Sequence, residues 1–426
     1  MVEKFFVETF GCTANTSATE LMSHLLHECG YEKVLDVNKA DFVLINTCVV
    51  KAPTESKIKD LLKRLYRKSS LIVSGCLPQV MVDWCHQNLP QAALLGVDHF
   101  GEICQAAKST LKGKSFELIT RKKEFCGEIL RDRNRPLTGI LEISKGCTGL
   151  CAYCIVRIAK GPLVSKSSYQ ILQEAKVALV EGCKELWLTA QDTASYGVDI
   201  NTSLPQLLEN LVDLPEDFLI RIGMMNVDYA CRILEPLKFY LQHPKVYSFL
   251  HIPLQSGSDS VLKKMYRKYT INEFKHLVEQ LRKEINLSLS TDIIVGFPGE
   301  TDEDFKKTLQ VLDEIQFDVV NISKYGDRKG TEASKSREKL PTEITKQRSV
   351  ALTEKVHEMT LGRNKNWIGW DGTALALRRD ERFSATLLRN KSYKLIAVDN
   401  STLELGKWYN IRITDALKTR LVGSLI

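Results

Sequence analysis

Three cysteines stand close together in the middle part of the chain, at Cys147, Cys151 and Cys154. They form a Cx3Cx2C motif a few residues after the apolar run ILEIS. Three thiolates in one short loop are typical of a [4Fe–4S] cluster, whose fourth iron then keeps an open position for a substrate or cofactor. A structural zinc site normally adds a second, distant pair of ligands, and buried cysteines that only fill space need no fixed spacing. We therefore favour an iron–sulfur site over the zinc and structural alternatives.

Three further cysteines lie nearer the N-terminus and far apart in sequence. Cys12, Cys48 and Cys76 each follow the end of a predicted strand. Because ligands bind at the carboxyl ends of the strands in open parallel sheets, the three thiols could form one site through the tertiary fold. Cysteine also packs in protein cores as a small hydrophobic residue, so both interpretations stay open on the residues alone.

The other six cysteines show no such placement. In a reducing cytosol, a chain of 426 residues is not expected to form a disulfide framework, and it does not need one. We expect these cysteines to be fillers of the cores: Cys29, Cys85, Cys104, Cys126, Cys183 and Cys231.

The N-terminal part alternates short apolar runs with helical patterns, which predicts an open parallel α/β sheet. The predicted strands cover residues 5–10, 41–46 and 71–74. A helix is predicted over residues 17–29, with Ser17 and Glu20 spaced as a capping box and Gly30 as its stop.

A basic stretch at residues 131–139 leads to a second series of strands and helices. Helices are predicted over residues 168–181 and 271–284. The predicted strands cover residues 139–144, 185–189, 219–223, 249–253, 290–295 and 319–324. Six βα-type units predict a partial (β/α)6 barrel, whose chemistry lies at the carboxyl ends of its strands.

The last part of the chain changes to short alternating strands after a charged helical pattern that begins near residue 343. The predicted strands cover residues 374–377, 384–388, 394–398 and 408–413. They predict a small antiparallel β-barrel, with a β-sandwich as the alternative. The whole chain is then an α/β protein of three domains, at residues 1–130, 131–360 and 361–426.

Composition sets the broad class. The chain is 44% hydrophobic and 26% charged, which is ordinary for a globular protein. It has no apolar run of the ~20 residues that a membrane span needs, and its N-terminus lacks the layout of a signal peptide. We expect a cytoplasmic monomer that does not bind membranes.

Basic charge is concentrated near the C-terminus. The net charge is +7, and residues 361–426 hold twelve Lys or Arg against six Asp or Glu. Six of these basic residues lie around the predicted loops: Arg378, Arg379, Arg382, Arg389, Lys391 and Lys394. They could bind phosphate groups, and a merely solvated surface is the alternative. A second basic run, at residues 57–68, is better explained as the polar face of an amphipathic helix.

The central cysteine loop, with Tyr153 as its aromatic member, resembles that of the radical S-adenosylmethionine (SAM) superfamily. In that family SAM chelates the open iron and is cleaved to methionine and a 5′-deoxyadenosyl radical, and the protein binds and orients it. The resemblance implies that SAM contacts come from residues after successive barrel strands. These are Tyr153, Gln191, Asp192, Gln255, Ser256, Arg267 and Gly296.

Each of these contacts has a specific implied role. Gln191 and Asp192 resemble residues near the methionine amino group, although a turn with a cap is the alternative there. Gln255 and Ser256 would bind ribose hydroxyls or the methionine end, and a glycine at Gly296 would let the backbone approach the adenine closely. Arg267 resembles an arginine that reaches a carboxylate, and an ordinary solvated helix charge is its alternative.

The segments TFGCTANTSATE, INTCVV and SGCLPQ resemble the three cysteine motifs of the methylthiotransferases. In that family Cys12, Cys48 and Cys76 would hold a second [4Fe–4S] cluster that handles the transferred sulfur. The C-terminal β module resembles the TRAM domain, which binds RNA. The implied partners are a tRNA, an electron donor and a sulfur source, the last two of unknown identity.

The segments QDTASYG and CIVRIAKG resemble the archaeal and eukaryotic-like branch of the methylthiotransferases. That branch modifies C2 of N6-threonylcarbamoyladenosine next to the tRNA anticodon. Relatives that act on isopentenyladenosine or on a ribosomal protein share the cysteine motifs and remain alternatives, as does a non-catalytic iron–sulfur protein that binds RNA. One departure is Lys160-Gly161, where bacterial relatives often have Arg-Gly.

Overall fold

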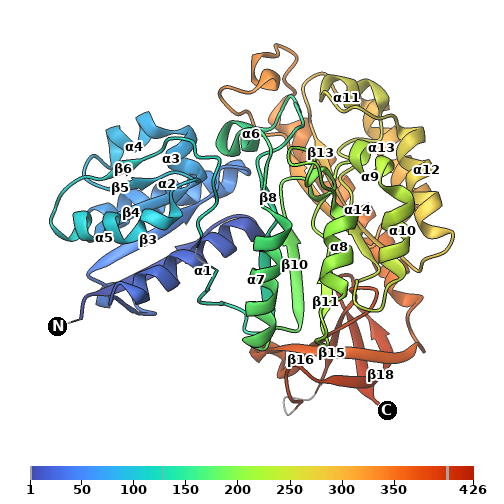
Figure 1. The fold of residues 1–426 in the computed structure, drawn as a ribbon. Helices are drawn as coiled ribbons and strands as arrows, with labels where there is room; N and C mark the ends of the chain where they lie inside the picture. Colours follow the sequence, from blue (N-terminus) through green and yellow to red (C-terminus); the bar gives the residue numbers. More distant parts are fainter. Residues whose placement is uncertain (1, 128, 400–402) are drawn as a thin grey trace.

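A computed structural model describes residues 2–127, 129–399 and 403–426. Its first part is a six-stranded sheet in the order β2-β1-β3-β4-β5-β6, with every neighbouring pair parallel (Figure 1). The strands are β1 (Lys4–Thr9), β2 (Glu32–Lys33), β3 (Phe42–Thr47), β4 (Ser70–Gly75), β5 (Ala93–Leu95) and β6 (Glu117–Leu118). The predicted open parallel α/β sheet is confirmed.

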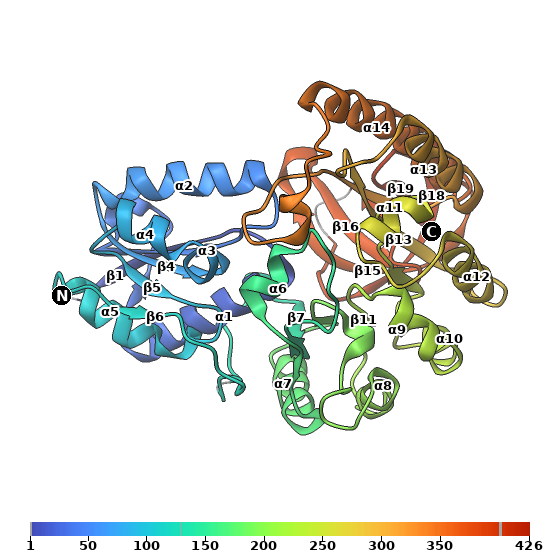
Figure 2. The same cartoon turned by 90° about the horizontal axis from the view of Figure 1, so that it is seen from above.

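Helices cover both faces of this sheet (Figure 2). They are α1 (Thr13–Glu28), α2 (Ala52–Tyr66), α3 (Cys76–Val80), α4 (Val82–Asn88) and α5 (Ile103–Leu111), with 3₁₀ turns η1 (Val37–Lys39) and η2 (Phe100–Glu102). The apolar side chains of α2, α3 and α4 pack on one face, and those of α1 and α5 pack on the other. In α2 the buried residues include Ile58, Leu62 and Leu65, so the basic run at 57–68 is the polar face of a helix, as predicted.

Helix α1 begins four residues before its predicted start. Cys12 occupies the N-cap position, and the expected capping-box residues Ser17 and Glu20 are buried inside the helix. The helix starts early because Gly11, at φ +119°, turns the chain sharply after β1. Gly30, at φ +86°, ends the helix as predicted.

The central part is a partial barrel of six parallel strands. They are β7 (Thr138–Glu142), β10 (Glu185–Thr189), β11 (Leu219–Arg221), β12 (Phe249–His251), β13 (Ser288–Val295) and β14 (Val319–Lys324). Two single bridges, Ile220–Val246 and Met224–His251, join the β11 side to the β12 side. Each predicted barrel strand is present. The short strands β8 (Ser144–Lys145) and β9 (Val164–Ser165) flank the cysteine loop.

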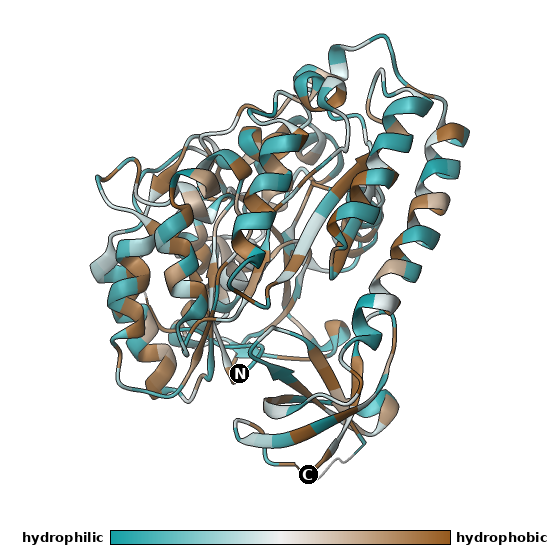
Figure 3. Ribbon diagram, turned by 90° about the vertical axis from the view of Figure 1, so that its right-hand side faces the viewer, coloured by the Kyte–Doolittle hydropathy of each residue, from teal (hydrophilic) through white to brown (hydrophobic). Residues whose placement is uncertain are grey.

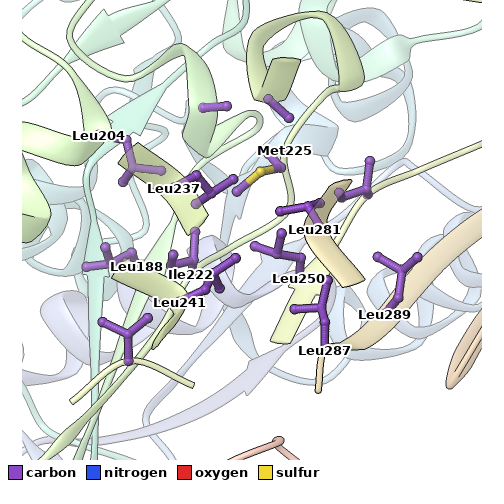
Figure 4. Close-up of a cluster of buried hydrophobic side chains, with 14 of the residues drawn as sticks. Leu188, Leu204, Ile222, Met225, Leu237, Leu241, Leu250, Leu281, Leu287 and Leu289 are labelled. Atoms are coloured by element: carbon purple, nitrogen blue, oxygen red, sulfur yellow. The ribbon is translucent and has the colours of Figure 1, made fainter. Parts of the chain in front are cut away.

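Helices surround this barrel and bury a continuous apolar core, part of which Figure 4 shows. They are α6 (Ile155–Lys160), α7 (Ser168–Val180), α8 (Leu204–Val212), α9 (Val227–Arg232), α10 (Leu234–Gln242), α11 (Asp259–Lys264), α12 (Ile271–Arg282), α13 (Asp302–Ile315) and α14 (Thr342–Lys365), with η3 (Thr193–Ser195) and η4 (Glu332–Lys335). Leucines from strands and helices interdigitate in this core, among them Leu188, Leu250 and Leu281 (Figure 4). The core holds the barrel strands in place, so the loops at their carboxyl ends have a rigid base.

The C-terminal part is a closed five-stranded barrel in the order β15-β16-β17-β19-β18. Its elements are β15 (Asp371–Asp380), η5 (Glu381–Phe383), β16 (Ala385–Asn390), β17 (Leu395–Val398), β18 (Trp408–Ala416) and β19 (Leu421–Leu425). The predicted small β-barrel is confirmed: most neighbouring pairs are antiparallel, and β19, which the prediction missed, pairs with β17 in parallel. This pairing closes the barrel and leaves no free edge. Figure 3 shows the long helix that leads down to this barrel.

The six cysteines outside the two trios behave in three ways. Cys85 and Cys183 are buried fillers, as predicted. Cys126 and Cys231 are exposed, so the prediction was wrong for them. It was also wrong for Cys29 and Cys104, which form a disulfide between the end of α1 and α5. The two residues are 75 positions apart, and they meet because both helices pack on one face of the sheet.

None of the helices in the described ranges combines the length and the apolarity that a membrane-spanning segment needs.

Candidate functional site

The central trio of cysteines lies in the loop that follows β7 and β8, at the carboxyl end of the first barrel strand. Cys154 is the N-cap of α6, and its backbone N–H donates to the Cys151 carbonyl at 3.1 Å. A Cβ added to Gly149 would lie 3.3 Å from Cys147 Sγ and 3.8 Å from Cys151 Sγ. Both sulfurs therefore flank the same small residue, and all three thiols sit half-buried at one end of the barrel.

Burial governs the electrostatics of this trio. It raises the pKa of Cys147 to about 12, and Asp192, Cys154 and Cys151 push the pKa in the same direction. Burial also raises the pKa of Cys154, again with help from Cys151. Burial and the neighbouring thiols thus disfavour the ionised forms of Cys147 and Cys154, so without a cation these two thiols keep their protons. A metal centre that binds here would displace those protons as it gained three thiolate ligands.

The second trio lies at the carboxyl edge of the N-terminal sheet. Cys12 follows β1, Cys48 follows β3 and Cys76 begins α3 directly after β4. These three strands are adjacent and parallel, so their ends meet. A Cβ added to Gly11 would lie 3.1 Å from Cys48 Sγ, which places Cys48 against the residue that precedes Cys12.

The thiols of this second trio also influence one another. Burial raises the pKa of Cys76 to about 12, and the charges of Cys48 and Cys12 raise it further. Burial raises the pKa of Cys48, with Cys12 contributing in the same direction. Cys12 is exposed while the other two are buried. The structure therefore brings together three residues that lie far apart in sequence, with one side open to solvent.

Within the described residues, no three His, Cys, Asp or Glu side chains are arranged to hold a metal ion as they stand. Each trio lies in one region of the fold but does not form such a single-ion site. A zinc ion takes all its ligands at one centre, whereas a cubane cluster takes each cysteine on a different iron. A cubane therefore does not require the three sulfurs of a trio to point at one centre.

Arg267 faces the central trio. Its Nη1 donates to Cys151 Sγ at 3.3 Å, and its guanidinium lies over the Tyr269 ring, 5.0 Å from the centroid. Nε and Nη2 are buried and have no hydrogen-bond partner among the described residues. The alternative of a solvated helix charge is thereby wrong, because Arg267 follows α11 and points inward.

Two glutamines that follow barrel strands share this property. Gln191 follows β10 and Gln255 follows β12, and each has a buried Oε1 without a partner within the described part of the chain. Gln255 also adopts φ +69°, which is uncommon for a residue other than glycine. Buried polar atoms are nearly always paired in native proteins. Unpaired donors and acceptors that follow the carboxyl ends of barrel strands are therefore suited to a polar ligand such as SAM.

The carboxylate of Asp192 already accepts hydrogen bonds from neighbouring residues. It accepts hydrogen bonds from the backbone N–H of Asn226 at 3.0 Å, from Asn226 Nδ2 at 2.8 Å and from the Ala194 N–H at 3.2 Å. It thus caps η3, the role that the sequence allowed as an alternative. Burial raises the pKa of Asp192 to about 6, and a cationic amine beside it would favour its ionised form.

The other predicted SAM contacts have clear structural partners. Ser256 is fully buried and accepts from the Ser258 N–H at 3.3 Å. Tyr153 packs edge-on against Phe297, with 6.3 Å between ring centroids. Gly296 has φ +74°, and a Cβ there would lie 2.3 Å from Thr345 Oγ1 on α14. The close approach that the structure shows at Gly296 is therefore to α14.

A buried lysine near the second trio was not identified from the sequence. Lys160 ends α6, its side chain is 4% exposed, and its Nζ lies 3.4 Å from Glu142 Oε1. Burial disfavours its charge, but Glu142, Cys76 and Cys12 outweigh that effect and raise its pKa. The sequence showed Lys160 only as a departure from the Arg-Gly pattern.

Three of the six basic residues assigned to phosphate binding are structural instead. Arg389 pairs with Glu185 at 2.7 Å, Lys394 pairs with Asp318 at 2.8 Å, and Lys391 donates to the Pro244 carbonyl at 3.0 Å. These side chains lie against the partial barrel and are not free for a phosphate. The other three are exposed: Arg378, Arg379 and Arg382.

Residues 141–312 match the radical SAM superfamily, and residues 4–96 match a family described as Uncharacterized protein family UPF0004. The first match contains the central trio and the second contains Cys12, Cys48 and Cys76.

Curated relatives cover the whole chain. It is 36% identical to the probable threonylcarbamoyladenosine tRNA methylthiotransferase of Pyrococcus abyssi, over 99% of both chains. It is 34% identical to the human threonylcarbamoyladenosine tRNA methylthiotransferase, over 99% of this chain and 74% of that protein. The corresponding protein of Drosophila melanogaster is 35% identical, over 100% of this chain and 78% of its own length.

Solved structures support the fold. TsrM from Kitasatospora setae, a radical SAM methyltransferase, aligns with a TM-score of 0.56 at 13% identity, over 78% of this chain and 77% of TsrM. The cobalamin-dependent radical SAM enzyme OxsB aligns with a TM-score of 0.51 at 12% identity, over 84% of this chain and 56% of OxsB. At such low identity these likenesses concern the fold alone.

The partial barrel, its cysteine loop and these matches define a radical SAM enzyme, a class that uses a [4Fe–4S] cluster and SAM. Within that class, the likeness over the full chain is more specific. The chain belongs to the threonylcarbamoyladenosine tRNA methylthiotransferase family.

Proposed function

We propose that this enzyme methylthiolates C2 of N6-threonylcarbamoyladenosine in a tRNA anticodon loop, next to the anticodon. The observation that supports this proposal is the similarity, over nearly the whole chain, to relatives named threonylcarbamoyladenosine tRNA methylthiotransferase. Sulfur would replace the C2 hydrogen and then be methylated, with one SAM for the methyl group and another for the radical. The C2–H bond is too strong and too weakly acidic for ordinary removal by a base, which is the reason for radical chemistry.

The two trios take different roles in this proposal. Cys147, Cys151 and Cys154 hold the cluster that generates the radical from SAM. Cys12, Cys48 and Cys76 hold a second [4Fe–4S] cluster that handles the sulfur. Support for the second assignment is the convergence of three thiols at one sheet edge, open to solvent at Cys12.

The residues around the central trio would bind and orient SAM. The unpaired nitrogens of Arg267 are suited to the carboxylate of the methionine part, and Asp192 is suited to its amine. The free Oε1 atoms of Gln191 and Gln255 can accept from the amine or from ribose hydroxyls. Tyr153, Ser256 and Gly296 would shape the pocket around these contacts.

We also propose the domain division 1–130, 131–360 and 361–426, which follows the three sheet systems. The last boundary falls near the end of α14. The C-terminal barrel would bind tRNA through Arg378, Arg379 and Arg382. Although Arg378 is exposed, partial desolvation and the nearby charges of Arg135 and Arg389 lower its pKa, so an anionic phosphate would relieve repulsion there.

We propose that the enzyme acts in the cytoplasm, because its proposed substrate is a tRNA, and that it acts there as a monomer. Its reaction consumes electrons and sulfur, so it needs an electron donor and a sulfur source in addition to the tRNA.

One assay tests the main proposal. The protein is reconstituted anaerobically with iron and sulfide, reduced, and incubated with SAM and tRNA that carries N6-threonylcarbamoyladenosine; the digested nucleosides are analysed by mass spectrometry. We expect the 2-methylthio nucleoside and 5′-deoxyadenosine. If product formed only from isopentenyladenosine tRNA, or only from a ribosomal protein, that molecule would be the substrate and the proposal would be wrong. Intact SAM despite full iron loading would favour the non-catalytic alternative.

Two cysteine variants separate the trios in the same assay. Cys151→Ala should abolish SAM cleavage, because the central cluster loses a ligand. Cys48→Ala should still form 5′-deoxyadenosine but give no methylthio product. If Cys48→Ala formed normal amounts of product, the assignment of the second cluster would be wrong.

A further inference from the structure

One short helix connects the two cysteine trios. Helix α6 has Cys154 as its N-cap and Lys160 as its last residue. It packs against α3, which begins at Cys76. Ile155 and Ala159 of α6 belong to the same buried cluster as Cys76. The position of one trio is thus coupled to the other through six helical residues.

The end of α6 brings a buried ion pair to the second trio. Lys160 is 4% exposed and Glu142, at the end of β7, is 16% exposed, with 3.4 Å between Nζ and Oε1. Lys160 directly follows Ala159, which is buried in one cluster with Cys76, and the charges of Lys160 and Glu142 both act on Cys76. Burying such a pair gives little or no net stability compared with well-packed apolar side chains. The stability of the fold alone therefore does not explain a charge at this position.

We infer that Lys160 is a positioning residue of the second site, whose fixed positive charge sets the reduction potential of the cluster held by Cys12, Cys48 and Cys76. This inference rests on the proposed function, which places a cluster there. Net charge and hydrogen bonds around a cluster set its potential. Reduction adds negative charge to the cluster, and a buried cation nearby stabilises that added charge. Lys160 therefore raises the potential, and Glu142 lowers it.

The opposite signs of the two charges make the test specific. The full chain carries Cys147→Ser, Cys151→Ser and Cys154→Ser, so that only the second trio can be loaded. After anaerobic reconstitution we measure the iron per chain, the EPR spectrum of the reduced protein and the reduction potential by titration. We expect about four irons per chain. In this background Lys160→Met should shift the potential to a more negative value, and Glu142→Gln should shift it to a more positive value.

Two further variants control for packing. Lys160→Arg keeps the charge, so it should restore the potential and the EPR spectrum that Lys160→Met changes. Lys166 forms another buried pair, with Glu174 at 2.7 Å, and both side chains are less than 10% exposed. Lys166→Met removes a buried cation that pairs with Glu174 instead of Glu142, and it should leave the potential unchanged.

The outcomes distinguish the role of Lys160 from the presence of the second cluster. Four irons with no shift, or with shifts of the same sign in Lys160→Met and Glu142→Gln, would overturn the role of Lys160 and leave the second cluster intact. Absence of iron from the parent background would overturn both the second cluster and the role of Lys160. If Lys160→Met fails to load iron, Lys160→Gln and Glu142→Gln still report the sign of the effect.

Discussion

Arg267 shows how one side chain can connect the cysteine loop to a ligand. Its Nη1 donates a hydrogen bond to Cys151 Sγ. Its Nε and Nη2 are buried and have no partners among the described residues. Hydrogen bonds between charged partners contribute about 1.5–3 kcal/mol each, and a buried group left unpaired is destabilising. An incoming carboxylate would therefore satisfy Arg267 and be oriented by it.

This arrangement predicts a large effect of Arg267 on SAM binding. Arg267→Met should weaken the binding of SAM by about tenfold or more, the equivalent of one lost charged hydrogen bond. The measurement is equilibrium dialysis with the reconstituted enzyme, and Arg267→Lys should recover only part of the affinity because its ammonium lacks the planar fork. The iron content of each variant serves as the control. Unchanged SAM affinity at full iron loading would contradict the proposed contact.

The hairpin formed by β16 and β17 has a structural role that its basic composition does not suggest. It lies against the amino ends of the barrel strands, where the Ser248 N–H donates to the Lys391 carbonyl at 2.9 Å. Tyr393 packs on Phe249, with 4.4 Å between ring centroids. Lys394 reaches Asp318, which precedes β14 and also binds Arg363 of α14. The hairpin thus joins the C-terminal barrel to the partial barrel.

Asp318 makes this junction sensitive to acid. Burial alone would raise its pKa, but Lys394 and Arg363 outweigh burial and hold the pKa below its usual value. A carboxylate with a lowered pKa stabilises the fold fully above its unfolded pKa of about 3.9 and loses that contribution as pH falls towards the folded-state pKa. Asp318→Asn should therefore lower the thermal stability clearly at pH 7, since losing one partner of a buried pair costs about 3–5 kcal/mol.

The pH dependence is the decisive part of this measurement. Calorimetric scans of the parent and of Asp318→Asn should show a difference in Tm that shrinks below about pH 4. A difference that stayed constant from pH 7 to pH 3.5 would show that lost packing, not lost charge, causes the effect.

Across the whole molecule, the cysteine trios and the C-terminal barrel lie far from each other. Helix α6, which follows the central trio, is at the opposite end of the partial barrel from β15 and β16 (Figure 1). A tRNA bound through Arg378, Arg379 and Arg382 must therefore extend along the molecule to bring an adenosine to the trios. Substitutions in the C-terminal barrel should then change the affinity for tRNA, and substitutions at the trios should change the radical reaction.

This separation predicts the behaviour of a charge variant. Replacing Arg378, Arg379 and Arg382 together by Gln should weaken tRNA binding and reduce the slope of log affinity against log salt by roughly 2–3, since each lost phosphate contact contributes about 0.7–0.9. SAM cleavage without tRNA should be unaffected. The matched control is Arg389→Gln, which removes a basic residue of the same barrel that pairs with Glu185; it should lower stability and leave the salt slope unchanged. Equal slopes in all three proteins would contradict the assigned surface.

Local sequence patterns determined the central cysteine loop and most of the secondary structure of this protein. The central trio occupies eight consecutive residues, so its loop follows from short-range spacing. The barrel strands and α7 and α12 follow from runs and periodicities of apolar residues, which depend on the secondary structure alone. The carboxyl-end rule for parallel sheets then places Cys12, Cys48 and Cys76 at one edge once the strand order is known.

The tertiary structure decided what side chains far apart in sequence do together. It made β1, β3 and β4 neighbours, joined Cys29 to Cys104, buried Lys160 beside Glu142 and directed Arg389 and Lys394 to acidic partners on the barrel. A charged residue has the same periodic signature whether it meets water, a phosphate or a buried carboxylate. The partner of a charged side chain depends on how whole helices and strands pack together, and a local sequence pattern does not contain that information.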